Sequence, residues 1–110
     1  MKINCEAKAD CCVNKKLTEA YVGLAKFLRI IGDNNRLKIL CLLKDEELYV
    51  DELSCNLGLA QNLISSHLKI LNSFNLLKIR KVGKKNYYHT NREVFKKYNS
   101  LLTSFLKNYE

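Results

Sequence analysis

Residues 51–71 read DELSCNLGLAQNLISSHLKIL, and residues 77–89 read LKIRKVGKKNYYH. The first stretch predicts two short amphipathic helices, 51–57 and 61–72, joined by a tight turn in which Gly58 takes a left-handed conformation. The second stretch predicts a basic β-hairpin that turns at Gly83. Two short helices followed by such a hairpin are typical of a winged helix-turn-helix, in which one helix enters the major groove of DNA.

Helical spacing predicts three further helices around this motif. The first covers 17–31, ends at the Gly32-Asp33-Asn34 turn and carries four apolar residues on one face: Tyr21, Leu24, Leu28 and Ile31. The second runs from a cap at Asn34 to about residue 44, and its apolar residues are Leu37, Leu40, Cys41 and Leu43. The last helix covers 91–107 and carries a wide apolar stripe: Val94, Phe95, Tyr98, Leu101, Leu102 and Phe105.

Residues 48–50 predict a short extended segment, and residues 77–82 and 86–89 predict the strands of the hairpin. The chain is therefore expected to have a mainly α (α+β) fold: two helices, a short strand, two helices, two strands and a final helix. Residues 16–110 would form this winged helix-turn-helix domain. Residues 1–15 are polar and aperiodic, so they are expected to form a flexible arm that holds Cys5, Cys11 and Cys12.

The composition narrows the choice of partner and compartment. With 19 Lys and Arg against 11 Asp and Glu, the formal net charge of +8 favours a polyanionic partner. We expect a cytoplasmic protein without a membrane partner, because no apolar run approaches the roughly 18 residues of a spanning helix and no signal peptide is apparent. The five cysteines are then expected to be thiols or metal ligands. An enzyme is not expected, because the sequence shows no catalytic triad or acid–base cluster.

The predicted DNA-reading surface has two parts. On helix 61–72 the polar face carries Gln61, Asn62, Ser65, Ser66 and Lys69. Asn and Gln can pair with adenine, Ser can donate or accept, and Lys can reach guanine or phosphate. The hairpin adds cations for phosphates or the minor groove: Lys78, Arg80, Lys81, Lys84 and Lys85. Such a helix face is often merely solvated, and the basic hairpin beside it is what favours DNA. His67 falls on the inward side and is expected to be buried or to face a phosphate.

The order and spacing of these motifs resemble the ArsR/SmtB family of winged-helix repressors. The resemblance spans about residues 20–106 and rests on GDNNRLKIL (32–40), ELYVDEL (47–53), LGLAQ (57–61), SSHLKIL (65–71) and the hairpin 83–89. It implies a homodimer, built largely from the first and last helices, that represses an operon until an inducer binds.

Three residues depart from the family pattern. The recognition helix opens with Ala60-Gln61-Asn62 where the family usually has Ser and then Gln-Pro, and alanine is a poorer N-cap than serine by ~1 kcal/mol. Ser66 stands where the family frequently has Arg. Operator affinity is therefore expected to depend more on the hairpin.

The family also implies where an inducer could bind. Its Cys-Val-Cys metal motif reads Tyr49-Val50-Asp51 here, and the last helix has no His for the family's other metal site. The remaining thiols suggest a three-sulfur site of Cys11, Cys12 and Cys55, sometimes formed in relatives by an arm of the other subunit. Three thiolates select soft ions such as arsenite, antimonite or cadmium. No cofactor is expected to be needed for DNA binding.

Three alternatives to this sensing site remain open. The arm thiols can be idle and Cys55 a small filler. The repressor can instead respond to oxidant or persulfide, although Cys41 falls on the apolar stripe, where a free thiol behaves as a small buried hydrophobe. A winged helix can also act as a protein-interaction module without sensing.

Overall fold

The computed structural model describes the backbone of residues 15–110 and the side chains from residue 19 onward. Its elements are α2 (Lys15–Ile31), α3 (Asn34–Leu43), α4 (Val50–Leu57), α5 (Gln61–Ser73), β1 (Leu77–Val82), β2 (Lys85–Thr90) and α6 (Arg92–Lys107). This order confirms the predicted winged helix-turn-helix. The predicted arm and its cysteines Cys5, Cys11 and Cys12 lie outside the described residues, except that Lys15 begins α2.

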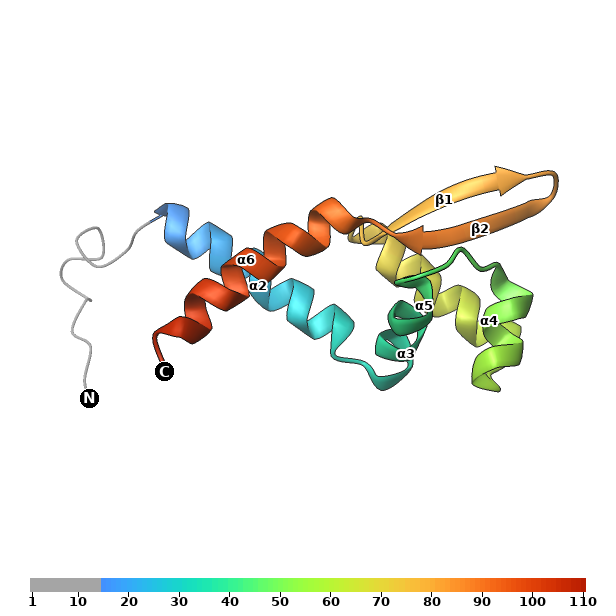
Figure 1. The fold of residues 1–110 in the computed structure, drawn as a ribbon, viewed down its shortest axis with the longest axis horizontal. Coiled ribbons are helices and arrows are strands. Elements are labelled where there is room, and N and C mark those ends of the chain that lie inside the picture. The colour runs from blue at the N-terminus through green and yellow to red at the C-terminus, as the bar shows by residue number, and fades with distance from the viewer. Residues whose placement is uncertain (1–14) are drawn as a thin grey trace.

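The molecule is elongated, with two ends of different character (Figure 1). At one end α2 and α6 cross each other, and at the other end α3, α4 and α5 gather beneath the β1–β2 hairpin. None of the helices from α2 to α6 combines the length and the apolar character that crossing a bilayer requires.

One hydrophobic core joins the two ends. Its fully buried side chains are Ile39, Leu43, Leu53, Ile64, Leu68, Leu71 and Leu76. From α2, Leu24 and Phe27 reach this core, and the Phe27 ring stacks on Tyr98 of α6 with centroids 4.5 Å apart. Burying side chains of this kind contributes about 1.5–3 kcal/mol each, so the helices of the motif are held mainly by their inward faces.

Three turns follow local backbone rules. Gly58 (φ 66°) takes the left-handed conformation that the sequence predicted, and Gly83 (φ 61°), where only a turn was predicted, takes it too. The cap of α3 was assigned to the wrong residue, because Asp33 and not Asn34 lies in extended backbone just before the helix. The Asp33 carboxylate accepts from the amides of Asn35 (2.9 Å) and Arg36 (3.1 Å). The hydrogen bond from the Arg36 amide lowers the pKa of this carboxyl group.

The structure corrects the predicted inward faces at several positions. Leu28 of α2 is 38% exposed, because Leu24 and Phe27 take the inward side against α6. Cys41 of α3 is exposed and is therefore not a buried filler; Ile39, Leu40 and Leu43 fill that side. On β1 only Leu77 is buried, while Ile79 and Val82 are 44% and 46% exposed. The hairpin extends beyond the core, so only its base is covered.

The base of the hairpin is attached to the body of the protein by a third, very short strand. Leu48 forms an isolated β-bridge with Tyr88, in which the Leu48 amide donates to the Tyr88 carbonyl at 3.1 Å and the Tyr88 amide donates back at 2.8 Å. This bridge matches the extended segment predicted at residues 48–50, although α4 already begins at Val50.

Candidate nucleic-acid interface

Helix α5 separates its side chains into a buried face and a solvent face. Ile64, His67, Leu68 and Leu71 are buried at the i, i+3, i+4 and i+7 positions of the inward face. The five residues predicted to read DNA are all exposed: Gln61, Asn62, Ser65, Ser66 and Lys69. The fold thus presents these polar groups together on one side of a helix that it holds rigidly from the other side.

The start of α5 is weakly capped. Ala60 is the N-cap and offers no side-chain hydrogen bond to the first turn, as its sequence position predicted. The Asn62 side chain accepts from the Leu63 amide at 2.9 Å, so part of its hydrogen-bonding capacity is already used within the helix. The Ser54 hydroxyl closes the preceding turn by donating to the Leu59 carbonyl.

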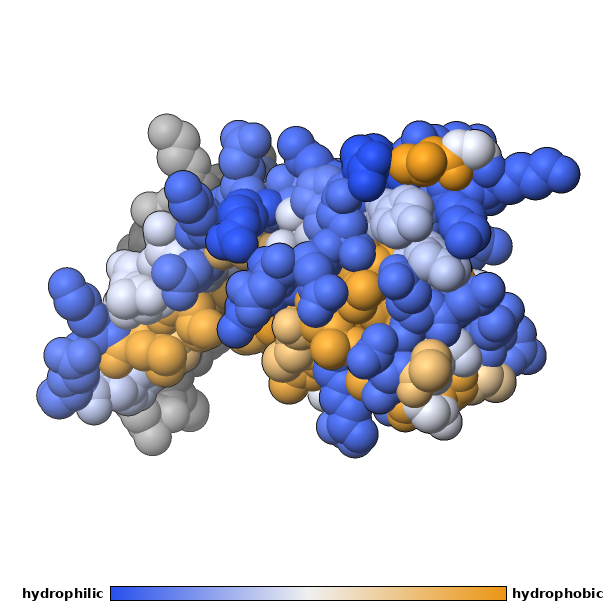
Figure 2. All heavy atoms as spheres, turned by 45° about the vertical axis from the view of Figure 1, so that its right-hand side comes forward, coloured by the Kyte–Doolittle hydropathy of each residue, from blue (hydrophilic) through white to orange (hydrophobic). Residues whose placement is uncertain are grey.

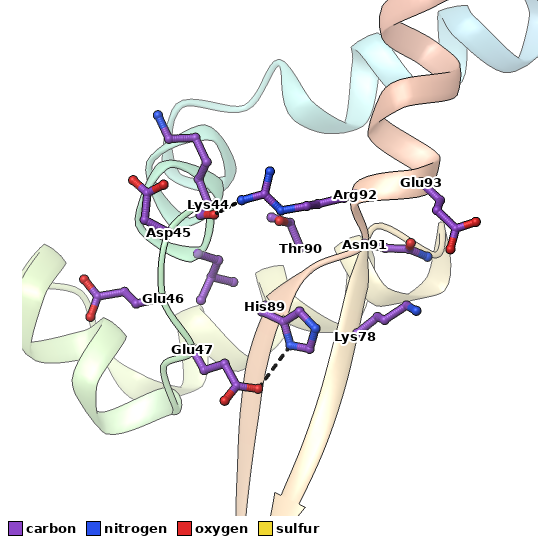
Figure 3. Close-up of a pocket in the computed structure, with 11 residues that line it drawn as sticks. Lys44, Asp45, Glu46, Glu47, Lys78, His89, Thr90, Asn91, Arg92 and Glu93 are labelled. Carbon is purple, nitrogen blue, oxygen red and sulfur yellow. Dashed lines mark hydrogen bonds and ion pairs between the residues drawn. The ribbon is translucent and has the colours of Figure 1, made fainter.

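The hairpin has two faces, which its register defines. Cross-strand pairs such as Lys78–His89 and Arg80–Tyr87 share one face. On this face Arg80 does not stand free: its guanidinium forms an ion pair with Glu47 at 2.8 Å. The hydrogen bond from Arg80 lowers the pKa of the Glu47 carboxyl group. Oε2 of Glu47 also lies 3.3 Å from Nδ1 of His89 (Figure 3), although that nitrogen has no hydrogen-bond partner among the described residues.

Lys85 is held in a similar way by an aromatic cluster. Its ammonium group lies 4.3 Å from the centre of the Tyr49 ring, and its pKa is raised, chiefly by a hydrogen bond with the Tyr49 side chain. Tyr49 in turn packs edge-on against Tyr87, with centroids 5.3 Å apart. Cation–π contacts of this kind contribute about 0.5–1 kcal/mol at exposed sites, enough to orient a wing lysine without binding it tightly.

The other predicted cations are unengaged. Lys69, Lys81 and Lys84 are exposed, and none of them forms an ion pair within residues 15–110. Lys78 is also exposed and lines a groove of about 500 Å³ between the α3–α4 loop, the wing base and the start of α6 (Figure 3). Of the ten predicted DNA-binding residues, Arg80 and Lys85 are thus the two cations that the protein already binds itself.

Sequence reasoning did not find the residues that hold the wing. Glu47 and Arg80 are separated by 33 positions, and no helical or strand period connects them. The sequence predicts an extended segment at residues 48–50 but gives neither Glu47 nor Tyr49 a contact with the hairpin. The sequence offers only a weak signal for these contacts: an acidic residue, Glu47, and an aromatic residue, Tyr49, stand just before α4.

One arginine connects α5 to the end of α2. Nε of Arg36 donates to Nδ1 of His67 at 3.3 Å, and Nη1 of Arg36 donates to the Ile30 carbonyl at 3.0 Å. His67 is 8% exposed, which confirms the predicted burial. Because its Nδ1 accepts, the neutral ring carries its proton on Nε2. That atom has no hydrogen-bond partner among the described residues.

The cysteines in the described part of the chain do not form a metal site by themselves. Cys55 on α4 and Cys41 on α3 are both free and exposed. From residue 15 onward, no three His, Cys, Asp or Glu side chains gather closely enough to hold a metal ion. A thiol site that uses Cys55 therefore needs ligands from residues 1–14 or from another chain.

Comparison with known proteins gives consistent matches. The model of the family described as "Bacterial regulatory protein, arsR family" matches residues 33–78. The transcriptional activator HlyU of Vibrio cholerae serotype O1 is 41% identical over 61 residues, which are 56% of this chain and 56% of HlyU. The match thus spans little more than half of that relative.

An arsenical resistance operon repressor of Staphylococcus aureus is 35% identical over 75 residues, 68% of this chain and 72% of that protein. Among solved structures, reduced HlyU from Vibrio cholerae superposes with a TM-score of 0.68 at 28% identity, covering 87% of this chain and 98% of that one.

Proposed function

The chain belongs to the ArsR family of bacterial regulatory proteins, and from this premise we propose that it is a homodimeric repressor that binds a duplex operator. It is a transcriptional regulator and not an enzyme, in keeping with its relatives. The observation that best supports the proposal is that the polar face of α5 and the unengaged lysines of the β1–β2 wing belong to the same end of the molecule (Figure 1).

In this proposal the parts of the surface have different tasks. Gln61, Asn62 and Ser65 read base edges in the major groove, and Ser66 and Lys69 contact the groove or its backbone. Lys81 and Lys84 near the wing tip bind phosphates, and Lys78 adds charge at the wing base. Arg80 and Lys85 orient the wing through Glu47 and Tyr49 and contribute their charge to the same field.

The proposed partner for the opposite end is a second copy of the chain. Large apolar side chains are exposed on α2 and α6: Val22 (49%), Leu28 (38%), Phe105 (39%) and Leu106 (51%). Figure 2 shows hydrophobic atoms exposed over this end of the molecule. A two-fold dimer through these helices would present two α5 helices to half-sites about 34–36 Å apart.

DNA binding can be tested by selecting duplexes from a random pool and measuring affinity by fluorescence anisotropy. We expect selection of a near-palindromic site and an affinity that falls steeply with salt, because each neutralised phosphate releases counterions. A scrambled duplex is the control. Failure to select any duplex, or an affinity that does not respond to salt, would favour a protein-interaction module instead.

For the inducer, we propose a soft ion such as arsenite, held by the thiolates of Cys11, Cys12 and Cys55. Cys55 is exposed on α4 and so is open to such a ligand. Three sulfur donors suit As(III) and similar soft ions, and one relative is named an arsenical resistance operon repressor. Binding must favour a dimer geometry in which the two α5 helices no longer fit both half-sites.

Chain length favours a site that is shared between two copies. Lys15 begins α2 at the end remote from α4 (Figure 1). The 17 residues of α2 span about 25 Å at helical rise. Cys12 precedes Lys15 by three residues, which reach about 10 Å when fully extended. This reach is short beside the length of α2, and we propose on that ground that the arm thiols serve Cys55 of a second copy.

Mixed dimers test this arrangement. Arsenite added to the reduced protein should give ultraviolet sulfur-to-arsenic absorption and release DNA, and both effects should be lost in C11S/C12S and in C55S. Mixing these two variants should restore about a quarter of the absorption, because about half of the randomly formed dimers are mixed and each mixed dimer rebuilds one of its two shared sites; a site within one protomer would restore none. C41S is the control and should respond normally. An unchanged signal in C11S/C12S would end the proposal.

A second candidate is a thiol redox switch, which one observation favours: Cys41 and Cys55 are both exposed. A similar solved structure is titled reduced HlyU. In this case diamide, without any metal ion, should change the electrophoretic mobility of the protein and release DNA. A response to diamide without a metal ion, and its loss in C41S, would distinguish this candidate from the arsenite site, for which C41S should respond normally.

A further inference from the structure

A groove between α3 and α6 has a lining that the proposed DNA-binding surface and arsenite site do not use. It encloses about 410 Å³, within the range of about 300–1,000 Å³ that small-molecule sites occupy. Leu37, Leu40 and Cys41 line it from α3, and Phe95 lines it from α6. These residues recur at helical spacing, so the two helices face each other with apolar walls.

The rim of this groove is cationic. Lys44, Arg92 and Lys96 line it, and neither Asp nor Glu does. Within residues 15–110 none of these three cations forms an ion pair. Arg92 is fixed in place, because Nη2 donates to the Lys44 carbonyl at 3.0 Å (Figure 3). Glu93 points away from this side of α6, toward the wing base (Figure 3).

We infer that this groove binds a small amphipathic organic anion, a carboxylate with an apolar tail. The tail would lie between Leu37 and Phe95, where it removes exposed apolar surface from water. The carboxylate would meet Arg92 and Lys96 at the first turn of α6, where the helix dipole also favours negative charge. A neutral apolar ligand would leave the cations unpaired, and an inorganic anion would leave the apolar walls exposed to water. Both should therefore bind more weakly.

Cys41 provides a direct measurement of binding, because its exposed thiol lines the groove whereas that of Cys55 on α4 does not. Octanoate, below its micelle concentration, is added to the DNA-free, reduced protein before alkylation with iodoacetamide. Peptide mass mapping then gives the rate at each cysteine. We expect saturating octanoate to slow alkylation of Cys41 at least fivefold and to leave Cys55 unchanged. 1-Octanol and inorganic phosphate should protect Cys41 less than twofold.

Two sets of variants test the cationic rim by calorimetric titration with octanoate. R92Q/K96Q is expected to raise the Kd at least tenfold, the size of a lost charged hydrogen bond. K96Q alone, which keeps the Arg92 contact with Lys44, is expected to raise it at least threefold. K97Q/K107Q removes the same charge from exposed positions of α6 outside the groove and should bind as the unchanged protein does. Absence of Cys41 protection, equal protection by 1-octanol or phosphate, or an unchanged Kd in R92Q/K96Q would each overturn the inference.

Discussion

The two ends of this molecule expose different kinds of side chain. At the α5–wing end the exposed groups include amides, hydroxyls and the lysines Lys69, Lys81 and Lys84, which have no ion pair within the described chain, beside exposed apolar side chains such as Ile79 and Val82. At the α2–α6 end they include Val22 and Leu106, which are 49% and 51% exposed. The first end needs a partner that supplies negative charge, and the second needs one that supplies apolar surface. What a surface exposes thus indicates the chemistry of what covers it.

The largest effect is expected when charge is placed on the apolar α2–α6 end. V22E/L106E should make the protein monomeric and lower operator affinity at least 100-fold, because linking two half-sites commonly contributes 10²–10⁴ in affinity. Sedimentation and anisotropy measure the two effects. L63E makes the same kind of change at an exposed leucine of α5 and should leave the dimer intact. A V22E/L106E protein that stays dimeric would show that another surface joins the copies.

Removing charge from the polar end should have a smaller effect. K81Q/K84Q should weaken binding to every duplex about tenfold or more without changing the dimer. The salt dependence should fall by a slope of roughly 3.6, since four phosphate contacts are lost per dimer at about 0.9 each. K97Q/K107Q removes two lysines of α6, away from the wing, and should leave the salt dependence of binding unchanged. An equal loss of slope in both variants would mean that net charge, rather than the wing, binds DNA.

A third prediction concerns the N-terminal cap of α5 and its effect on folding stability. Because Ala60 provides no side-chain cap to α5, A60S should stabilise the folded protein by ~1 kcal/mol. The midpoint of urea unfolding should rise with an unchanged slope. A25S places the same side chain at an exposed position in the middle of α2, where no free amide awaits it, and should give no gain. A stabilisation by A25S as large as that by A60S would contradict the capping explanation.

The smallest effect is expected from the ion pair at the wing base. The Arg80 hydrogen bond lowers the pKa of Glu47 below its ordinary value of 4.5. A carboxyl group with a lowered pKa contributes stability that is complete above its unfolded pKa and is lost as pH falls through the folded one. Unfolding measured from pH 6 to pH 2 should therefore depend less on pH in E47Q. An identical acid profile in both proteins would show that the ion pair contributes nothing in solution.

The order of the elements could be predicted because it follows from local rules. Gly58 and Gly83 adopt positive φ, and the buried residues of α5 repeat with the helical period. The inward face of α2 was predicted less well. Apolar residues lie on more than one side of α2, and period alone cannot decide whether Leu28 or Phe27 faces inward.

The contacts of the candidate site depend on residues that are far apart in the chain. The wing cations were predicted by composition, but the partners of Arg80 and Lys85 were not. Glu47 and Tyr49 come from a different segment, and only folding brings them to the wing. The cap at Asp33 was missed by one position, which is within the usual uncertainty of helix boundaries. The three-thiol site remains a prediction, since two of its residues precede the described part of the chain.

The contacts of Arg36 have a mechanical consequence. Its guanidinium holds the last turn of α2 with one nitrogen and the middle of α5 with another. Arg36 therefore joins α2 and α5 through one rigid planar group, in addition to the direct contacts between these two helices. R36K keeps the charge but has a single nitrogen, which cannot replace both Nε and Nη1, so at least one of the two contacts that join α2 to α5 should be lost.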